Sequence, residues 1–343
     1  MKNMLKIDLY FLNSIKIVMK KSFIALSTIC LSIASFSTFA TPPKAVAITT
    51  AQQQVAGFYK SQFGEYRVTS LLDGTIYLNP DLFKNLNAAQ KSQILTKYAA
   101  VDAKGIQTSV NAFLVDDGKS LTLVDSGAAS CFGPQLGSIA KNIVLAGYKL
   151  EDVKTVLLTH LHPDHVCGIT QNGQAVFPNA TVYAHEREAD FWLNPANEKT
   201  VPEAKKENYL STVKNVKAAL APYQARKAFK TFKDGNVIQG FDVIDTHGHT
   251  PGHHSFRLKS KDQQMVFIGD IVHSHSLQFD APKTAVDFDT NAEQAVNTRL
   301  KMFAEISKKQ QWVAAPHLPF PGIGHIYSAD GKRYQWMPVY FKD

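Results

Sequence analysis

The chain has 343 residues, 45% of them hydrophobic, a net charge of +8 and three cysteines. A chain of this length buries enough apolar surface to fold without disulfides. The first 40 residues hold five lysines and one aspartate, so the remainder carries only +4, which does not favour a nucleic-acid-binding surface. No low-complexity linker divides residues 41–343, and we therefore expect a single domain there.

The first 40 residues have the pattern of a signal peptide. Lys20-Lys21 precedes an apolar stretch over residues 23–35 that contains no acidic residue, and Thr38-Phe39-Ala40 fits a small-x-small cleavage site. The apolar stretch is too short for a stable membrane span. We therefore expect residues 1–40 to be removed on export, with Met19 as an alternative translation start, and a periplasmic or secreted mature protein.

The three cysteines leave two questions open. Cys30 lies within the signal-peptide region, but Ile29 before it is not the small residue of a lipoprotein site, so that alternative is weaker. Cys131 and Cys167 remain in the mature chain. An exported protein can join such a pair, but a chain of this size does not need the bond, and we expect two separate buried thiols.

Strand and helix patterns recur along residues 41–343. The first strand is expected at residues 66–72, where side chains alternate before the turn residues Asp73-Gly74. Further strands are expected at 110–115, 121–124, 153–158, 181–184, 241–245, 255–258, 265–268 and 312–315. Helices are expected at 136–146, from 186 onward, at 203–221 and at 291–308. Strands with helices set between groups of them predict sheet layers covered by helices.

The histidines are clustered. All twelve lie between His160 and His325, and the densest run, His160-Leu161-His162-Pro163-Asp164-His165, directly follows a predicted strand. Imidazole and carboxylate are the usual ligands of zinc and related metals. So many ionisable groups would be costly to bury without partners. The run therefore predicts half of a site for two metal ions.

Other candidate ligands also follow predicted strands. His249 comes after the strand at 241–245, Asp270 after that at 265–268, and His317 after that at 312–315. Side chains at the ends of several strands meet at one rim, which is how a rigid sheet builds a site from distant parts of the sequence. We expect these groups to complete the metal site.

Two sets of motifs carry a family resemblance. The first comprises Leu123-Val124-Asp125-Ser126-Gly127, the His160–His165 run, His249-Thr250-Pro251-Gly252-His253, Gly269-Asp270 and Ala315-Pro316-His317. In order and separation these resemble the metallo-β-lactamase superfamily, which implies a mixed α/β (α+β) fold, the αβ/βα four-layer sandwich. The second set resembles the methyl parathion hydrolase family and related dihydrocoumarin and lactone hydrolases: Cys131-Phe132-Gly133-Pro134, Ala189-Asp190-Phe191-Trp192-Leu193, Gln278-Phe279-Asp280 and residues 318–325.

The resemblance implies a binuclear centre with seven ligands. His160, His162 and His249 would hold the first ion. Asp164, His165 and His317 would hold the second, and Asp270 would bridge both. The expected cofactors are two divalent transition-metal ions, Zn²⁺ before Mn²⁺, Co²⁺ or Fe²⁺. Such a pair lowers the pKa of a bridging water, so that Asp164 and Asp270 would also serve catalysis by a metal-bridging hydroxide.

At His273 the sequence differs from the families that it resembles. Related acyl-homoserine-lactone lactonases have a tyrosine three residues after the bridging aspartate, and methyl parathion hydrolase looks apolar there. An imidazole suits a lactone or ester, whose alkoxide leaving group gains from a hydrogen bond or a proton. The alternative is a solvent-facing histidine in the loop His273-Ser274-His275.

Several further residues are candidates for the surroundings of the site. Four aromatic residues are expected to form an apolar substrate pocket, with ordinary core packing as the alternative: Phe132, Trp192, Phe279 and Phe288. Asp125 is expected in a turn or behind a ligand rather than on a metal. His253, His254 and His325 are expected near the ligands, His185 and His247 are expected to be ordinary histidines, and Cys167 is expected to pack beneath the site.

These features predict a binuclear metal-dependent hydrolase of lactones or aryl esters, with promiscuous hydrolysis of organophosphates. One alternative makes organophosphate triesters the main substrates, and another is a non-catalytic metal-binding module. The chain lacks the basic surface expected of a nuclease. The second set of motifs does not favour a glutathione thioester hydrolase. The expected partner is a small-molecule ester or lactone, with a homodimer as an option, no nucleic acid, and no stable membrane span in the mature chain.

Overall fold

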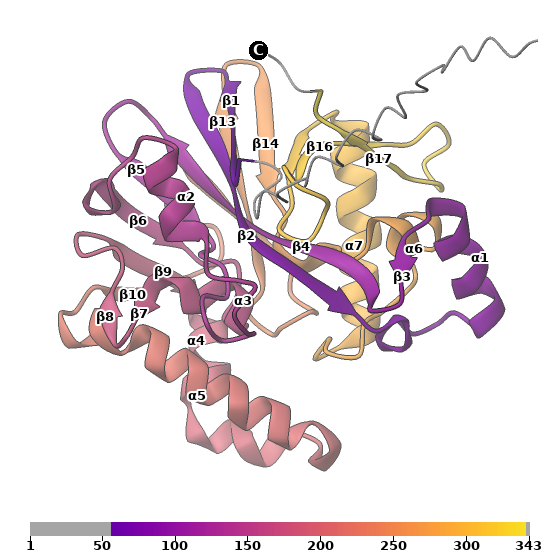
Figure 1. The fold of residues 1–343 in the computed structure, drawn as a ribbon, viewed down its shortest axis with the longest axis horizontal. Helices are drawn as coiled ribbons and strands as arrows, with labels where there is room; N and C mark the ends of the chain where they lie inside the picture. Colours follow the sequence, from indigo (N-terminus) through magenta and orange to yellow (C-terminus); the bar gives the residue numbers. More distant parts are fainter. Residues whose placement is uncertain (1–55, 341–343) are drawn as a thin grey trace, which may run out of the picture. The chain divides into compact units, whose positions relative to one another are not determined.

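Two mixed β-sheets form the centre of the computed structural model, which describes residues 56–340 (Figure 1). The predicted signal peptide, the alternative start at Met19 and Cys30 lie outside the described residues. The first sheet has the strand order β1-β2-β4-β5-β6-β9-β10, with β3 paired to β4. Its strands are β1 (Phe58–Phe63), β2 (Tyr66–Leu78), β3 (Val101–Asp102), β4 (Gly105–Asp116), β5 (Leu121–Val124), β6 (Val153–Leu157), β9 (Thr181–His185) and β10 (Phe229–Phe232).

The second sheet has the strand order β11 to β17 in sequence. Only β14 and β15 pair in parallel in this sheet, because the helical segment between them returns the chain to the end at which β14 begins. Its strands are β11 (Val237–Ile238), β12 (Phe241–Asp245), β13 (His254–Ser260), β14 (Gln263–Phe267), β15 (Trp312–Ala314), β16 (Ile323–Tyr327) and β17 (Gln335–Pro338). A separate ribbon pairs β7 (Thr170–Gln171) with β8 (Gln174–Ala175).

Seven α-helices connect and cover these strands in the described part of the chain: α1 (Ala88–Tyr98), α2 (Ile139–Leu145), α3 (Pro163–Val166), α4 (Glu186–Leu193), α5 (Glu203–Ala225), α6 (His275–Asp280) and α7 (Ala292–Lys308). The side chain of Asn291 caps α7 by accepting a hydrogen bond from the backbone N–H of Gln294. Among residues 56–340, none of the helices combines the length and apolar character needed to cross a bilayer.

The alternation of side chains along the strands produces four layers. In the first sheet, Val156 and Leu158 pack in the cluster that includes α2 and α5, whereas Leu157 faces the second sheet. In the second sheet, Phe267 faces the first sheet, whereas Val266 packs toward α7. Helices therefore cover the outer faces and an apolar core lies between the sheets (Figure 1). This confirms the predicted αβ/βα sandwich.

The predicted strands and helices are present, but the prediction of a turn at Asp73-Gly74 is wrong. Strand β2 continues through these residues with only a bulge between Leu72 and Gly74. The buried Asp73 carboxylate accepts hydrogen bonds from the backbone N–H groups of Ala128, Gly137 and Ile139. Asp73 therefore stabilises the segment that contains Ala128, Gly137 and Ile139. These tertiary contacts override the turn-forming preference of Asp-Gly.

The prediction of two separate thiols is also wrong, because Cys131 and Cys167 form a disulfide. The loop after β5 packs directly on the end of α3, where the backbone N–H of Gly168 donates to the carbonyl oxygen of Gly127 over 3.0 Å. A Cβ atom at Gly168 would collide with the carbonyl oxygen of Ser126, so only glycine permits this approach. The contact brings the two cysteines together although 36 residues separate them.

Candidate metal centre

The seven predicted ligands all lie just beyond the ends of strands of the two sheets. His160 and His162 follow β6, Asp164 and His165 lie in α3, and His249 follows β12. Asp270 lies in the short 3₁₀ helix Gly269–Ile271 after β14, and His317 follows β15. Each sheet therefore contributes ligands to one rim, as the positions in the sequence predicted.

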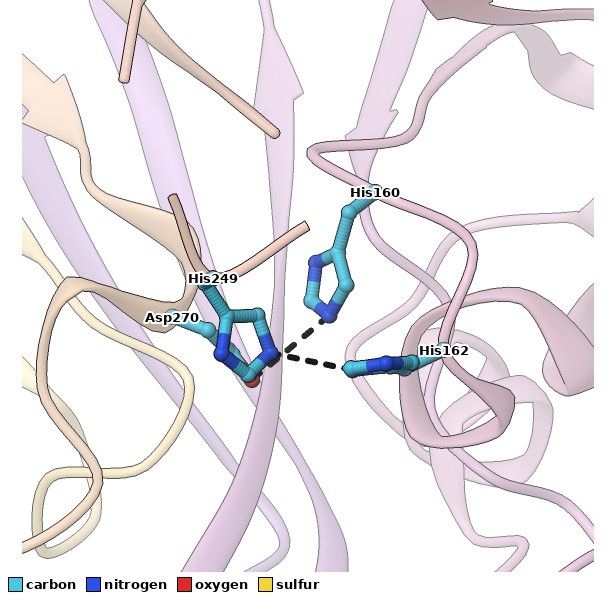
Figure 2. Close-up of side chains that lie close together, drawn as sticks. All are labelled: His160, His162, His249 and Asp270. Carbon is cyan, nitrogen blue, oxygen red and sulfur yellow. Dashed lines mark hydrogen bonds and ion pairs between the residues drawn. The ribbon is translucent and has the colours of Figure 1, made fainter. Parts of the chain in front are cut away.

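The first group of donor atoms consists of His160, His162, His249 and Asp270, which lie within 4.8 Å of one another. Figure 2 shows the three imidazoles converging on the carboxylate. His249 Nε2 lies 2.9 Å from His162 Nδ1 and 3.2 Å from Asp270 Oδ2. His160 Nε2 lies 3.6 Å from the same oxygen.

The second group consists of Asp164, His165 and His317, and it faces the other oxygen of Asp270. His165 Nε2 lies 3.1 Å and His317 Nε2 lies 3.2 Å from Asp270 Oδ1. His317 Nε2 is also 3.3 Å from Asp164 Oδ2. Asp270 thus presents one oxygen to each group, which is the arrangement that a bridging ligand requires.

Four of the histidines are oriented from behind by hydrogen bonds to Nδ1. His165 faces Asp125 at 3.0 Å and His249 faces Asp289 at 2.8 Å. The carbonyl oxygen of Ser109 lies 3.0 Å from His317 Nδ1, and Thr159 Oγ1 lies 3.1 Å from His160 Nδ1. A proton kept on Nδ1 leaves the Nε2 lone pair directed into the centre, as metal ligation requires.

The electrostatics of the first group favour a neutral His160 and His162 and an anionic carboxylate. Burial lowers the pKa of His160 well below its ordinary value, and it lowers that of His162 to about 3. Burial acts to lower the pKa of His249, but hydrogen bonds to Asp270 and Asp289 outweigh it and raise that pKa to about 9. Burial alone would raise the pKa of Asp270. The nearby His165, His317 and His160 outweigh this effect and hold the pKa of Asp270 well below its usual range.

The donor set fits a pair of divalent cations. Several buried donor atoms lack a hydrogen-bond partner: His160 Nε2, His165 Nε2 and Asp270 Oδ1. An unpaired buried polar atom is costly, and two ring nitrogens facing each other, as in His162 and His249, repel unless a proton or a cation lies between them. Cations on the two sides of Asp270 would satisfy all these atoms.

His273 lies inside the centre, so the alternative of a solvent-facing histidine is wrong. Its side chain is 3% exposed, and Nε2 lies 3.0 Å from Asp270 Oδ2. The ring stacks on that of His317 with centroids 5.4 Å apart. Burial lowers the pKa of His273 to about 4, even though Asp270 acts in the opposite direction, so the ring is neutral.

Two of the four predicted pocket aromatics contact the centre. The ring of Trp192 lies 5.5 Å from that of His162, and the ring of Phe288 lies 5.0 Å from that of His273. The other two assignments are not supported. Phe279 is buried in the core against Phe303, and Phe132 is 42% exposed on the loop after β5.

The remaining histidines divide into supporting and distant groups. His253 lies directly behind the centre, where its Nε2 accepts a hydrogen bond from the backbone N–H of Asp270 over 2.9 Å. His325 packs on Trp312 with ring centroids 4.0 Å apart. His247 pairs with Asp245 in a half-exposed position.

A further cluster of His185, His254 and Asp234 is held by ion pairing. His254 Nε2 lies 2.8 Å from one oxygen of Asp234, and Arg187 lies 3.4 Å from the other. The two imidazoles stack with centroids 3.9 Å apart at an interplanar angle of 17°. A nitrogen lone pair lies in the plane of its ring, so two nearly parallel rings do not converge on one ion. The metal-binding geometry is therefore found on the two sides of Asp270.

The contacts behind the ligands were only partly predictable. Asp125 follows a strand in a recognisable motif, and its position behind His165 agrees with the expectation from the sequence. Asp289 and Glu188 have no such signal. Asp289 stands in an irregular segment before α7, and Glu188 resembles any acidic residue in the first turn of a helix.

Comparison with known proteins places this geometry in a family. Residues 105–305 match the model of the metallo-β-lactamase superfamily. A crystal structure of the hydrolase AbOPH, in the β-lactamase superfamily, is 59% identical with a TM-score of 0.84, over 85% of this chain and 100% of that chain. AidC, a dizinc quorum-quenching lactonase in complex with the product N-hexanoyl-L-homoserine, is 26% identical with a TM-score of 0.74, over 84% of this chain and 99% of AidC.

A sequence match to the uncharacterized protein YobT of Bacillus subtilis (strain 168) is shorter. It is 28% identical over 148 residues, which is 43% of this chain and 56% of YobT. The family match covers more than half of the chain and includes six of the seven residues that converge at the rim. The protein therefore belongs to the metallo-β-lactamase superfamily and is a hydrolase of that superfamily.

Proposed function

We propose that the protein is a binuclear metal-dependent hydrolase of lactones or aryl esters. The observation that carries the proposal is the position of Asp270, whose two oxygens face two separate groups of histidines. His160, His162 and His249 would hold the first ion, Asp164, His165 and His317 the second, and Asp270 both. The mixed nitrogen and oxygen ligands suit Zn²⁺, with Mn²⁺, Co²⁺ and Fe²⁺ as alternatives.

The residues of the chain prepare the site for this chemistry. A pair of such ions would supply Lewis acidity and would lower the pKa of a water molecule, so that hydroxide is available at neutral pH to attack an ester carbonyl. Asp125, Asp289 and Ser109 hold the imidazoles in fixed orientations. Trp192 and Phe288 flank the histidines with apolar surface, which excludes bulk water and provides contact area for an apolar substituent.

His273 distinguishes the proposed substrate class. Its Nε2 is 3.0 Å from Asp270 Oδ2, which places an imidazole N–H beside the reacting region. A hydrogen bond from this group to the leaving oxygen assists an alkoxide, which is a poor leaving group. An aryl phosphotriester has a good leaving group and gains little. This contrast supports lactones whose leaving oxygen is an alkoxide, such as acyl-homoserine lactones, over organophosphates, and it does not extend to aryl esters, which also lose a phenolate.

A solved relative also supports this substrate class. AidC, which resembles 84% of this chain, is a lactonase.

The sequence pattern of residues 1–40 supports a periplasmic or secreted location for the enzyme.

The proposal is tested by comparing kcat/KM for dihydrocoumarin, an acyl-homoserine lactone and methyl paraoxon, using the mature protein with measured metal content. We expect the lactones to be preferred. A preference for methyl paraoxon by orders of magnitude would instead assign the protein as an organophosphate triesterase. A metal-loaded protein that is inert toward all activated esters would indicate a non-catalytic metal-binding module.

A further inference from the structure

Glu188 connects three segments around the first group of histidines. It lies in the first turn of α4 with 0% exposure, and its carboxylate accepts four hydrogen bonds. Oε1 accepts from the backbone N–H of Leu161 over 2.9 Å and from Trp192 Nε1 over 2.7 Å. Oε2 accepts from Thr250 Oγ1 over 2.7 Å and from the backbone N–H of Gly252 over 3.0 Å.

These partners belong to the two loops that carry the first group. Leu161 lies between His160 and His162, and Thr250 immediately follows His249. One carboxylate therefore joins the loop that provides two of the imidazoles to the loop that provides the third. Trp192, held by the same carboxylate, also packs its ring against His162.

The four hydrogen bonds of Glu188 require a carboxylate at this position and close packing of the His249 loop against α4. All four partners donate, so a glutamate accepts every bond, whereas the NH₂ group of a glutamine would face two donors. The loop and the helix also meet without space between them, because a Cβ at Gly252 would collide with the backbone nitrogen of Glu188. The carboxylate therefore has a fixed position relative to both loops.

The second group is not tied to Glu188 by these bonds. Asp164 and His165 lie in α3, where His165 is oriented by Asp125, and His317 is oriented by the carbonyl oxygen of Ser109. A disturbance at Glu188 therefore reaches the two groups unequally. It changes the spacing of the three imidazoles of the first group and leaves the supports of the second in place.

We propose that Glu188 is a positioning residue that selectively sets the metal affinity of the first group. The inference rests on the metal pair of the proposed function and is independent of the substrate class. Supporting contacts of this kind are worth about 10- to 100-fold in metal affinity. We therefore expect Glu188→Gln to bind one ion with wild-type affinity and the other about 10- to 100-fold more weakly.

The matched control is Glu186→Gln. Glu186 also lies in the first turn of α4, but it is partly exposed and faces Lys233 at 3.6 Å. Both substitutions remove a carboxylate from the same helix terminus, so an effect of helix charge alone would appear in both. Thr250→Val removes a single bond to Glu188 and keeps the side-chain shape, which provides a milder variant should Glu188→Gln fold poorly.

The measurements are metal stoichiometry, affinity by titration with Zn²⁺ against a chelator, and amide hydrogen exchange of the metal-free protein. We expect faster exchange at Leu161 and Gly252 in Glu188→Gln, two ions of unequal affinity in that variant, and a smaller loss for one ion in Thr250→Val. Glu186→Gln should match the wild type in every measurement.

Three results would overturn the inference alone: unchanged affinity for both ions in Glu188→Gln, equal weakening of both, or the same change in Glu186→Gln. A wild-type protein that binds no ion would overturn the proposed function together with this inference. The two failures are therefore distinguished by the metal content of the wild type.

Discussion

Asp289 Oδ1 accepts a hydrogen bond from His249 Nδ1 at 2.8 Å, although 40 residues separate the two in the sequence. The other oxygen of Asp289 accepts from the backbone N–H of Val286 over 2.9 Å, so the carboxylate is itself fixed. His249 consequently has one permitted tautomer and one ring orientation, both suited to a metal ligand.

Asp289→Asn should weaken metal binding and activity by about 10- to 100-fold. An asparagine presents its NH₂ group either to Val286 N–H or to His249 Nδ1–H, and it therefore loses one of the two bonds. The matched control is Asp287→Asn, because Asp287 lies in the same segment but its side chain is exposed and pairs with Lys84 at 3.7 Å. Equal effects of the two substitutions on metal affinity would contradict this role.

Asp270→Ala should weaken both metal positions at once. Its two oxygens lie 3.1 to 3.2 Å from histidines of the two groups, so the substitution removes a donor from each. Metal analysis after gel filtration should show fewer than two retained ions per chain, with kcat/KM lost in parallel. Retention of two ions would show that Asp270 does not bridge them.

His273→Leu should lower lactone turnover more than phosphotriester turnover. The substitution keeps a buried apolar side chain against Phe288 and removes the N–H beside Asp270. A loss of about 10²-fold in kcat for an acyl-homoserine lactone, whose leaving oxygen is an alkoxide, is expected from the removal of such a donor. His247→Gln, at an exposed position, serves as the control. Equal losses for the two substrate classes would remove His273 from the reaction.

Exhaustive chelation should abolish hydrolysis and lower thermal stability. The apoprotein leaves buried donors such as His160 Nε2 and His165 Nε2 unpaired. A ligand present at 100 times its Kd stabilises the folded state by about 2.7 kcal/mol, so Tm should rise when Zn²⁺, Mn²⁺ or Co²⁺ is restored. Full activity of the chelated protein, with no metal detected, would contradict the proposed function.

Removing the disulfide should lower stability by about 2 to 4 kcal/mol, because it closes a loop between Cys131 and Cys167, which are 36 residues apart. Urea unfolding of the Cys131→Ser/Cys167→Ser protein, compared with the wild type with and without a reductant, measures this difference. The reductant should have little effect on the double variant. Identical midpoints for the oxidised wild type and the double variant would show that the bond contributes nothing.

The ligand positions could be predicted from the sequence because short stretches of sequence reveal them. Four of them lie within six residues, and the others directly follow apolar strands, where a rim is expected. The supports behind them could not be predicted, because their meaning depends on contacts across the fold. Glu188 and Asp289 are ordinary acidic residues until the loops of His160 and His249 are placed beside them.

The same limit explains why some expectations from the sequence are wrong. Asp73-Gly74 has strong turn-forming preference, but backbone donors from a loop more than 50 residues away hold Asp73 within a strand. The pairing of Cys131 with Cys167 depends on a close packing of two loops that spacing does not reveal. Phe279 and Trp192 have similar hydrophobic surroundings in the sequence, and only the fold separates a core position from one beside the histidines.

The division of the ligands between the two sheets has a consequence for the newly made chain. The N-terminal half provides His160, His162, Asp164 and His165, and the C-terminal half provides His249, Asp270 and His317. Neither half alone can assemble the full coordination sphere of either cation. We therefore expect a nascent chain that lacks the second half to be unable to hold the metal pair, so that hydrolysis would begin only after the two halves have docked.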